Sequence, residues 1–306
     1  MTMLECKLAL ACVTLIMLAA AAGAQEGGLA DIVPEGAEME KVVGDLRFTE
    51  GPAWDGKGAL YFTDIPADRI YKLDADGQLS VFLEPSRNAN GLMFDDEGYL
   101  LACRHEGRDL VRISPEGEVE TLADSYNGKK LNSPNDLIIA KDGSIYFTDP
   151  RYGLAGRAQE QEVEGVYRRA PDGTVTRVVD DMTRPNGIFI SLDGRTLLVA
   201  DTEESKIRAY PIQADGSVGA GRDFIDMDRD NGRRPDGMTM DERGNIYCTS
   251  RGGIWVIDPA GELLGVIEVP EPPANCTFGG ADLKTLYATA RTSVYRMKLK
   301  VAGCGK

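Results

Sequence analysis

The chain has 306 residues, enough for one large domain or two small ones, and its 49 acidic against 34 basic residues give a formal net charge of −15. This acidic balance argues against a nucleic-acid partner and against binding to an anionic membrane. It suits a soluble protein whose ligand is a cation or a neutral small molecule.

The first 24 residues resemble a secretory signal peptide. Lys7 is followed by a long apolar run, and Ala22-Gly23-Ala24 supplies a small-residue cleavage site. The alternative is a membrane anchor, but the run is shorter than the ~20 residues that a span needs. We therefore predict a signal peptide over 1–24, a lead-in over 25–40, a secreted or periplasmic mature protein, and no membrane contact after cleavage.

Four cysteines remain once the signal is removed: Cys103, Cys248, Cys276 and Cys304. An oxidising compartment permits disulfides, and four cysteines allow three pairings between which the sequence does not choose. A bond between Cys276 and Cys304 would tie the C-terminal tail to the last repeat. The alternative for Cys103 and Cys248 is that they are small buried hydrophobic residues in strands.

One sequence frame recurs six times between residues 49 and 290. It consists of an oxygen-bearing residue, a short apolar run, a turn and a second apolar run. The oxygen-bearing residues, here called the anchors, are Glu50, Asn90, Asn135, Asn186, Asp236 and Asn275, at spacings of 40, 45, 51, 50 and 39 residues. Repeats of this length made of short strands are typical of propeller blades.

Each unit contains several candidate strands joined by turns. Asp55-Gly56, Asp142-Gly143 and Asp193-Gly194 are hairpin turn signals, and the runs after them are rich in β-branched and aromatic residues. Four strands per unit in six units predict an all-β, six-bladed β-propeller over residues 41–301. The longest connection, 153–165, is polar, and we expect it to be a mobile surface loop.

The anchors suggest a cation site. Equivalent positions in the blades of a propeller project toward one point on the axis, and all six anchors carry side-chain oxygens without any sulfur or imidazole. Such a set suits a hard cation, with calcium the first choice and magnesium or manganese behind it. The alternative is that each Asn or Asp before a glycine is a turn former that needs no metal.

Five motifs in chain order resemble those of a known family. TEGPAW, SPNDL, TDPRYG, RPNG and RPDGM resemble the motifs of senescence-marker protein, gluconolactonases and luciferin-regenerating enzyme, and the resemblance spans about residues 40–300. It implies a six-bladed propeller with a divalent metal, commonly calcium, at the channel mouth. It also implies hydrolysis of a small lactone or of a related ester.

The resemblance assigns roles to the anchors by position. It implies that the metal ligands are Glu50, Asn135, Asn186 and Asp236. Asp236 is also the implied catalytic general base, which is chemically reasonable for a carboxylate beside a metal. The other two anchors, Asn90 and Asn275, would then line the substrate pocket.

Two positions depart from relatives within this resemblance. Animal lactonases have an arginine that holds sugar hydroxyls where this chain has Ser133, so we place Ser133 at the substrate pocket and leave sugar specificity open. A mechanism based on a histidine pair is excluded, because His105 is the one histidine in the sequence. For His105 a contact with substrate and a hydrogen-bonded loop position are both open.

Three aspartates at the ends of second strands, Asp64, Asp149 and Asp201, have two interpretations. They could support the pocket, or they could hydrogen-bond to the backbone between blades, which is the interpretation we favour. Arg151 and Tyr152, which follow Asp149, could border the pocket.

The sequence therefore supports two main hypotheses and a weaker third one. The first is an exported metal-dependent hydrolase of a lactone or related ester. The second is a non-catalytic propeller that binds a small ligand or a protein and uses calcium only for structure, because propellers host many unrelated functions. The third is an enzyme of another class, such as a strictosidine-synthase-like propeller, for which no catalytic glutamate can be identified.

Overall fold

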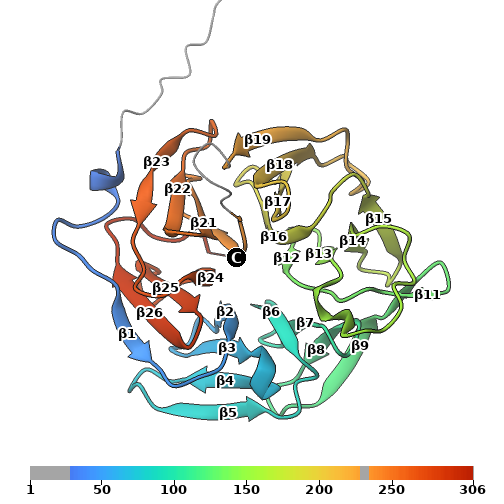
Figure 1. Cartoon of the computed structure of the whole chain (residues 1–306), viewed down its shortest axis with the longest axis horizontal. Helices are drawn as coiled ribbons and strands as arrows, with labels where there is room; N and C mark the ends of the chain where they lie inside the picture. The colour runs from blue at the N-terminus through green and yellow to red at the C-terminus, as the bar shows by residue number, and fades with distance from the viewer. Residues whose placement is uncertain (1–27, 228–233, 306) are drawn as a thin grey trace, which may run out of the picture.

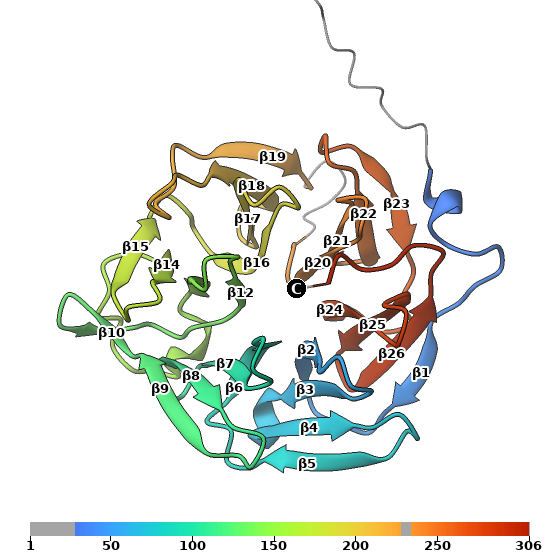
Figure 2. The same cartoon turned by 180° about the vertical axis from the view of Figure 1, so that it is seen from behind.

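Four-stranded antiparallel sheets follow one another around a central axis in the computed structural model, which describes residues 28–227 and 234–305. Figures 1 and 2 show six such sheets arranged as a ring, with the first strand of each unit nearest the axis. The arrangement confirms the predicted all-β, six-bladed β-propeller.

The strands of blades one to five are consecutive in the chain and run from the axis outward. Blade one consists of β2 (Thr49–Trp54), β3 (Leu60–Asp64), β4 (Arg69–Leu73) and β5 (Leu79–Leu83). Blade two consists of β6 (Ala89–Phe94), β7 (Leu100–Arg104), β8 (Asp109–Ile113) and β9 (Val119–Ala123). Blade three consists of β12 (Leu137–Ile139), β13 (Ile145–Asp149), β14 (Gly165–Arg169) and β15 (Val175–Val179). Blades four and five are β16 (Pro185–Ile190), β17 (Thr196–Asp201), β18 (Lys206–Pro211) and β19 (Arg222–Asp226); and β20 (Met238–Met240), β21 (Ile246–Ser250), β22 (Gly253–Ile257) and β23 (Leu263–Ile267). A short hairpin, β10 (Ser125–Tyr126) with β11 (Lys129–Lys130), projects between blades two and three.

The sixth blade joins the two ends of the described chain. Its inner three strands are β24 (Pro273–Gly279), β25 (Thr285–Ala290) and β26 (Ser293–Lys298), and its outer strand is β1 (Glu40–Val43). Glu40 lies opposite Arg296 in the ladder, and their side chains form an ion pair with Nε and Oε2 2.8 Å apart. This pairing closes the ring.

Hairpin turns within the blades follow from an Asp-x-x-Gly pattern. In blade two the Asp95 Oδ1 atom accepts backbone N–H bonds from Glu97 at 3.0 Å and Tyr99 at 2.9 Å. Gly98 has φ +87°, a conformation that a side chain disfavours. The aspartate and the glycine together make the tight turn between β6 and β7.

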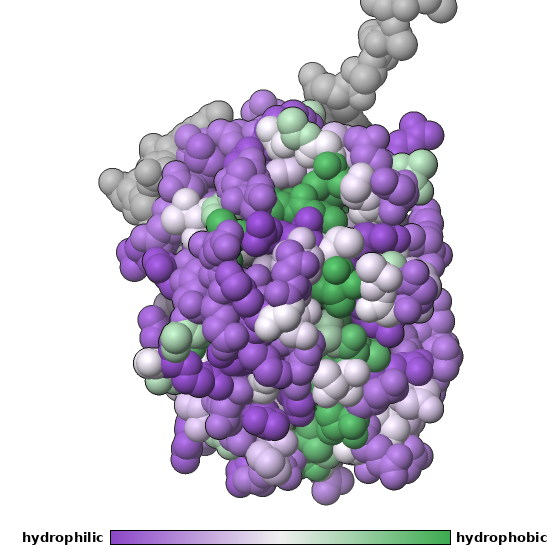
Figure 3. Space-filling view, turned by 90° about the vertical axis from the view of Figure 1, so that its right-hand side faces the viewer, coloured by the Kyte–Doolittle hydropathy of each residue, from purple (hydrophilic) through white to green (hydrophobic). Residues whose placement is uncertain are grey.

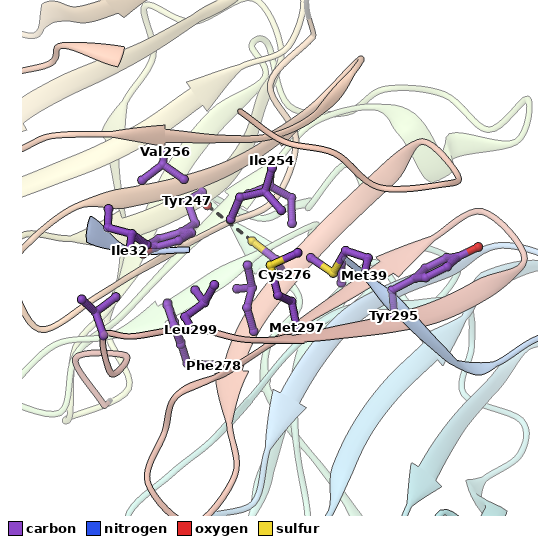
Figure 4. Packing of buried hydrophobic residues seen from close by; sticks show 14 of the residues in the cluster. Ile32, Met39, Tyr247, Ile254, Val256, Cys276, Phe278, Tyr295, Met297 and Leu299 are labelled. Carbon is purple, nitrogen blue, oxygen red and sulfur yellow. Dashed lines mark hydrogen bonds between the residues drawn. The ribbon is translucent and has the colours of Figure 1, made fainter. Parts of the chain in front are cut away.

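Hydrophobic side chains fill the space between neighbouring blades. Figure 4 shows one such cluster, where Tyr247 and Ile254 of blade five pack with Phe278 and Met297 of blade six. Ile32, which follows the short helix η1 (Leu29–Asp31), is fully buried in the same cluster. The predicted lead-in is thus packed onto the propeller in its described part.

The C-terminal residues lie across one end of the central channel, where both views mark the chain end at the centre of the ring. The Ala302 carbonyl accepts the Glu242 N–H at 2.8 Å, and the Cys304 N–H donates to the Met240 carbonyl at 3.1 Å. Cys304 and Gly305 help to line a cavity of about 230 Å³ together with Trp54, Leu92, Phe94, Phe189, Met240 and Phe278. This end of the channel is therefore apolar.

The four described cysteines are free thiols, so none of the three disulfide pairings is formed in the structure. Cys103, Cys248 and Cys276 are buried, as expected for small hydrophobic residues in strands, and Cys304 is partly buried.

The predicted signal peptide, 1–24, lies outside the described residues. Among the helices of the described chain, none has the length and apolar character to cross a membrane. On the side drawn in Figure 3, the surface is mostly hydrophilic, and hydrophobic residues form a narrow column between polar side chains.

Candidate active site

The six anchors sit where the inner strand of each blade begins. Glu50, Asn90, Asn186 and Asn275 are within the first three residues of β2, β6, β16 and β24, and Asn135 and Asp236 lie just ahead of β12 and β20. Asp236 keeps partial exposure, and the other five are buried. Because the inner strands surround the axis (Figure 1), the anchors meet at one end of the channel.

The glycine after an anchor serves close packing between blades. Gly187 is inside β16, and its N–H donates to the Asp236 carbonyl of the next blade at 3.1 Å. A Cβ atom at residue 187 would lie 2.2 Å from that carbonyl oxygen, so a larger residue would push the two blades apart. The Asn-Gly pair here is not a hairpin turn, and the turn-former explanation does not apply to it.

Hydrogen bonds link the anchor side chains from blade to blade. Asn90 Nδ2 donates to Asn135 Oδ1 at 2.7 Å, and Asn135 Nδ2 is 3.3 Å from Asn186 Oδ1. Asn186 Nδ2 in turn donates to Thr202 Oγ1 at 3.1 Å, and the Thr202 hydroxyl donates to the Pro235 carbonyl at 2.8 Å. The amides are thereby fixed in orientation around the channel mouth.

The carboxylates in the channel repel one another. Burial raises the pKa of Glu50 to about 7. Loss of solvation and the nearby Glu50 raise the pKa of Asp236 well above its usual value. Among the described residues, no Lys or Arg forms an ion pair with Glu50 or Asp236, so a positive charge from outside the chain would relieve this repulsion.

Asp136 is a third channel carboxylate that the sequence interpretation missed. It follows Asn135 and is buried, and burial together with Glu50 raises its pKa to about 8. Its Oδ2 lies 3.5 Å from Nδ2 of Asn275, which belongs to blade six on the opposite side of the ring. The sequence does contain a feature that could have identified it. In blades one, two, four and five a glycine follows the anchor, whereas in blade three an aspartate stands at this position.

His105 contacts one of the predicted substrate-binding anchors. Its Nε2 lies 3.3 Å from Asn90 Nδ2, and because an amide N–H can only donate, this contact requires an unprotonated ring nitrogen. Burial and the nearby Arg157 lower the pKa of His105 to about 4. Asn90 Oδ1 is buried without a hydrogen-bond partner among the described residues, so it is available to a ligand.

Ser133 holds the segment beside the mouth through two hydrogen bonds. It is fully buried; its hydroxyl donates to the Pro150 carbonyl at 2.7 Å and accepts the Gly153 N–H at 2.9 Å. This geometry favours a positioning role over the predicted contact with substrate. The residue that the segment presents is Tyr152, at the start of helix η3 (Tyr152–Leu154), with its hydroxyl 3.5 Å from Asn186 Nδ2.

The connection expected to be mobile is tied down in its first half. Arg157 donates to the carbonyls of His105, Glu106 and Gly153 at 3.1, 2.8 and 2.7 Å. Further along, Gln161 Nε2 donates to three backbone carbonyls of the β10–β11 hairpin region. These hydrogen bonds attach the segment to the loop that carries His105 and to the β10–β11 hairpin.

The three aspartates at the ends of second strands bind backbone. Asp64 accepts the N–H groups of Arg47 and Phe48, and Asp201 accepts those of Thr183 and Arg184. Asp149 accepts the Asn132 N–H at 2.8 Å. In each case the acceptor fixes the chain two or three residues before an anchor, in agreement with the interpretation favoured from the sequence.

Comparison with known proteins identifies the family. Residues 48–292 match the model of the SMP-30/gluconolactonase/LRE-like region. The chain belongs to this family. It is 33% identical over 293 residues to a gluconolactonase of Zymomonas mobilis, which covers 87% of this chain and 82% of the relative.

Solved structures agree. The fold superimposes on that of a gluconolactonase of Xanthomonas campestris with a TM-score of 0.83 and 34% identity, covering 89% of this chain and 92% of that one. A calcium-binding protein, regucalcin, of Agrobacterium tumefaciens has a TM-score of 0.73 at 22% identity over 88% and 95% of the two chains, which shows the shared fold alone.

The anchor set of this family member fits a divalent cation by its chemistry. The predicted ligands supply two carboxylates and two amide oxygens, the donor types that hard cations prefer. Within the described ranges, no three His, Cys, Asp or Glu side chains are grouped so that they could hold a metal. The predicted ligand set is of another kind, because two of its four members are asparagines. The unpaired carboxylates and the free Asn90 oxygen are consistent with an added cation and its ligands.

Proposed function

We propose that this chain is an exported, divalent-metal-dependent lactonase that hydrolyses a small lactone of the sugar-acid type. The observation that carries the proposal is the ring of oxygen donors at the channel mouth, in which Glu50 and Asp236 lack any cationic partner from the described chain. The family membership supports it, since relatives include proteins named gluconolactonase. Calcium is the cation that we propose, in line with the calcium-binding relative of the same fold.

The residues divide into holding, orienting and proton-moving groups. Glu50, Asn135, Asn186 and Asp236 would hold the cation, which when bound supplies a positive charge that polarises the lactone carbonyl. Asn90, with its free carbonyl oxygen, and Asn275 would orient the ring hydroxyls of the substrate. His105 fixes the Asn90 amide through its unprotonated ring nitrogen.

Asp236 would act as the general base. It takes a proton from the attacking water as the water oxygen bonds to the carbonyl carbon, and it returns this proton to the ring oxygen when the ester C–O bond breaks. The lactone and one water become a hydroxy acid, so no further reactant is required.

The first test is lactone hydrolysis with and without a chelator. We expect turnover of glucono-δ-lactone by the purified protein, loss of turnover in EDTA, and recovery when calcium is added back. Asp236→Asn should lower kcat/KM by about 10²- to 10⁴-fold. Activity that survives both metal removal and this substitution would disprove the mechanism.

The same experiment separates the enzyme from a non-catalytic propeller. If calcium served only the structure, chelation would lower the melting temperature while no lactone of a broad panel was hydrolysed. At a hundredfold excess over its dissociation constant, a ligand that binds only the folded state stabilises it by about 2.7 kcal/mol. Melting curves in EDTA and in calcium therefore report binding independently of turnover.

Export is proposed from residues 1–24 and has its own test. We expect the mature protein in the periplasm or the medium, with an N-terminus at Gln25 after cleavage behind Ala24. Cell fractionation followed by N-terminal sequencing checks this. Full-length protein in the cytosolic fraction would contradict it.

A further inference from the structure

Two arginines beside the anchor ring share one buried carboxylate. Glu164 is 7% exposed, and its Oε1 and Oε2 atoms lie 2.9 Å from Arg151 Nε and 2.9 Å from Arg184 Nε. Glu164 Oε2 also accepts the Arg151 N–H at 3.1 Å. Two guanidinium groups thus face one carboxylate.

Tyr152 connects this pair to the candidate active site. The Arg184 guanidinium carbon lies 5.1 Å from the centre of the Tyr152 ring, and the hydroxyl at the other end of that ring is 3.5 Å from the Asn186 amide. Arg184 therefore contacts the same tyrosine ring whose hydroxyl lies beside an anchor, and Arg151 joins it through Glu164.

The positive site is pre-organised. The Tyr152 segment is held by the Ser133 hydroxyl and by Arg157, and Arg184 begins the approach to β16 with its N–H on Asp201. Side chains that are already fixed lose little conformational entropy when a ligand binds. A guanidinium presents several donors in a fork that matches the oxygens of a carboxylate or phosphate.

Several charged groups surround the two arginines. Burial and the nearby Glu164 charge raise the pKa of Asp149, and Asp201 accepts the Arg184 backbone N–H at 3.1 Å. Arg234 lies on the same approach to the mouth but has its own partner, Glu203, at 3.7 Å. Glu204 accepts a hydrogen bond from the Thr183 hydroxyl at 3.1 Å.

The carboxylates Glu50, Asp136 and Asp236 of the channel oppose the binding of an anion unless a cation or a proton neutralises them. Attraction between an anion and the arginines is screened by salt, so it should weaken as the salt concentration rises.

We propose that Arg151 and Arg184 form an anion subsite, so that the preferred substrate is a lactone with a negatively charged group at the end remote from its carbonyl. This inference rests on the proposed lactonase function. It deepens that function because the six anchors alone would not distinguish a charged lactone from a neutral one.

The test compares two lactones that differ at one position. Glucono-γ-lactone has a hydroxymethyl group, and the γ-monolactone of glucarate has a carboxylate, at the remote end. We expect kcat/KM to be about tenfold higher for the charged lactone, as for one charge-assisted hydrogen-bonded pair. Arg184→Gln and Arg151→Gln should each remove most of this preference, because kcat/KM should fall more for the charged lactone than for the neutral one.

A control variant and a binding measurement complete the experiment. Arg222→Gln makes the same change of charge on β19, the outer strand of the blade that carries Arg184, and should leave the preference unchanged. If Arg184→Gln slowed both lactones equally, or if the wild type preferred the neutral one, the subsite would be refuted. Calorimetric titration with glucarate and with gluconate, both in excess calcium, compares their dissociation constants. This measures the contribution of the arginines to binding independently of turnover. Tighter binding of glucarate with no hydrolysis of any lactone would sustain the subsite while removing the proposed function.

Discussion

At one end of the central channel the inner strands begin with oxygen-bearing side chains, and at the other end the same strands finish with aromatic and aliphatic ones. The change takes four residues in β2, from Glu50 to Trp54, and four in β6, from Asn90 to Phe94. Asp136 follows the anchor of blade three, and its carboxylate lies 3.5 Å from the Asn275 amide of blade six.

The difference between the two ends separates function from stability. The apolar end of the channel, across which the C-terminal residues lie, is here called the closed end, and the end with the anchors is called the open end. Buried apolar side chains at the closed end favour the folded state because they are removed from water. Buried carboxylates at the open end oppose folding unless a cation or a proton neutralises them. Substitutions at one end should therefore change catalysis, and those at the other end should change the free energy of unfolding.

The largest expected effect is on the open end. Glu50→Gln keeps the shape of the side chain but removes one of two ligand charges, so we expect the calcium dissociation constant to rise at least about 100-fold, beyond the range for groups that only support a ligand. Lactone turnover at micromolar calcium should fall in parallel. Isothermal titration with calcium measures the first effect. Glu118→Gln, on an exposed turn of blade two, is the matched control and should change neither.

The next effect is on the closed end. Phe94 is 8% exposed, and its ring centre lies 5.0 Å from that of Tyr61 in an edge-on contact. Phe94→Ala should lower the free energy of unfolding by about 3 kcal/mol, as for other large-to-small changes in a core. Denaturant titration measures this loss. If kcat/KM of the folded variant also fell tenfold, the separation of stability at the closed end from catalysis at the open end would be wrong.

A smaller effect on stability is expected at Asp136. Asp136→Asn removes a buried charge while keeping an oxygen that can accept the Leu137 N–H. In EDTA at pH 8 the variant should be about 1 kcal/mol more stable than the wild type, because one repulsive carboxylate is gone. In calcium the order should reverse. Thermal melts in both conditions check it, and an equal shift in both would show that Asp136 does not sense the cation.

The smallest effect concerns pH. The pKa of His105 is lowered to about 4 in the folded state against 6.5 for the free side chain, so the unfolded chain binds the proton more readily. Stability should therefore decrease as pH falls below about 6.5, by about 1 kcal/mol at pH 5.5. The carboxylates titrate as well, so the readout is the difference between wild type and His105→Asn. A zero difference between pH 7.5 and 5.5 would contradict the assignment.

The repeat pattern made the propeller predictable. Asp-Gly turns and the regular return of one oxygen-bearing residue are local features, and each could be identified without knowledge of contacts. The place of β1 could not be identified in this way, because its partner β26 lies about 250 residues away and its short sequence has no distinctive turn. The sequence therefore predicted four strands for the sixth unit without showing that the fourth is β1, from the start of the described chain.

The site was predictable for the residues that repeat and much less so for those that do not. The six anchors were identified because they occupy equivalent positions, and the structure brings them together, although their roles stay predictions. Asp136 was missed because it occurs in one blade only, and Arg184 was missed because the Arg-Pro pair before an anchor was used as a motif without a role for its arginine. Ser133 was placed at the substrate by analogy with relatives, whereas its contacts depend on the path of the 150–153 segment.

The pairing of β1 with β26 also sets an order of events during synthesis. β1 is synthesised before the other strands and can pair with β26 only after β26 has also been synthesised. Five blades can therefore form while β1 and the edge of β26 are still unpaired. Exposed strand edges recruit other chains. A newly made molecule is thus most open to exchanging β1 with a neighbour just before its ring closes, and crowding of nascent chains would favour linked dimers over closed monomers.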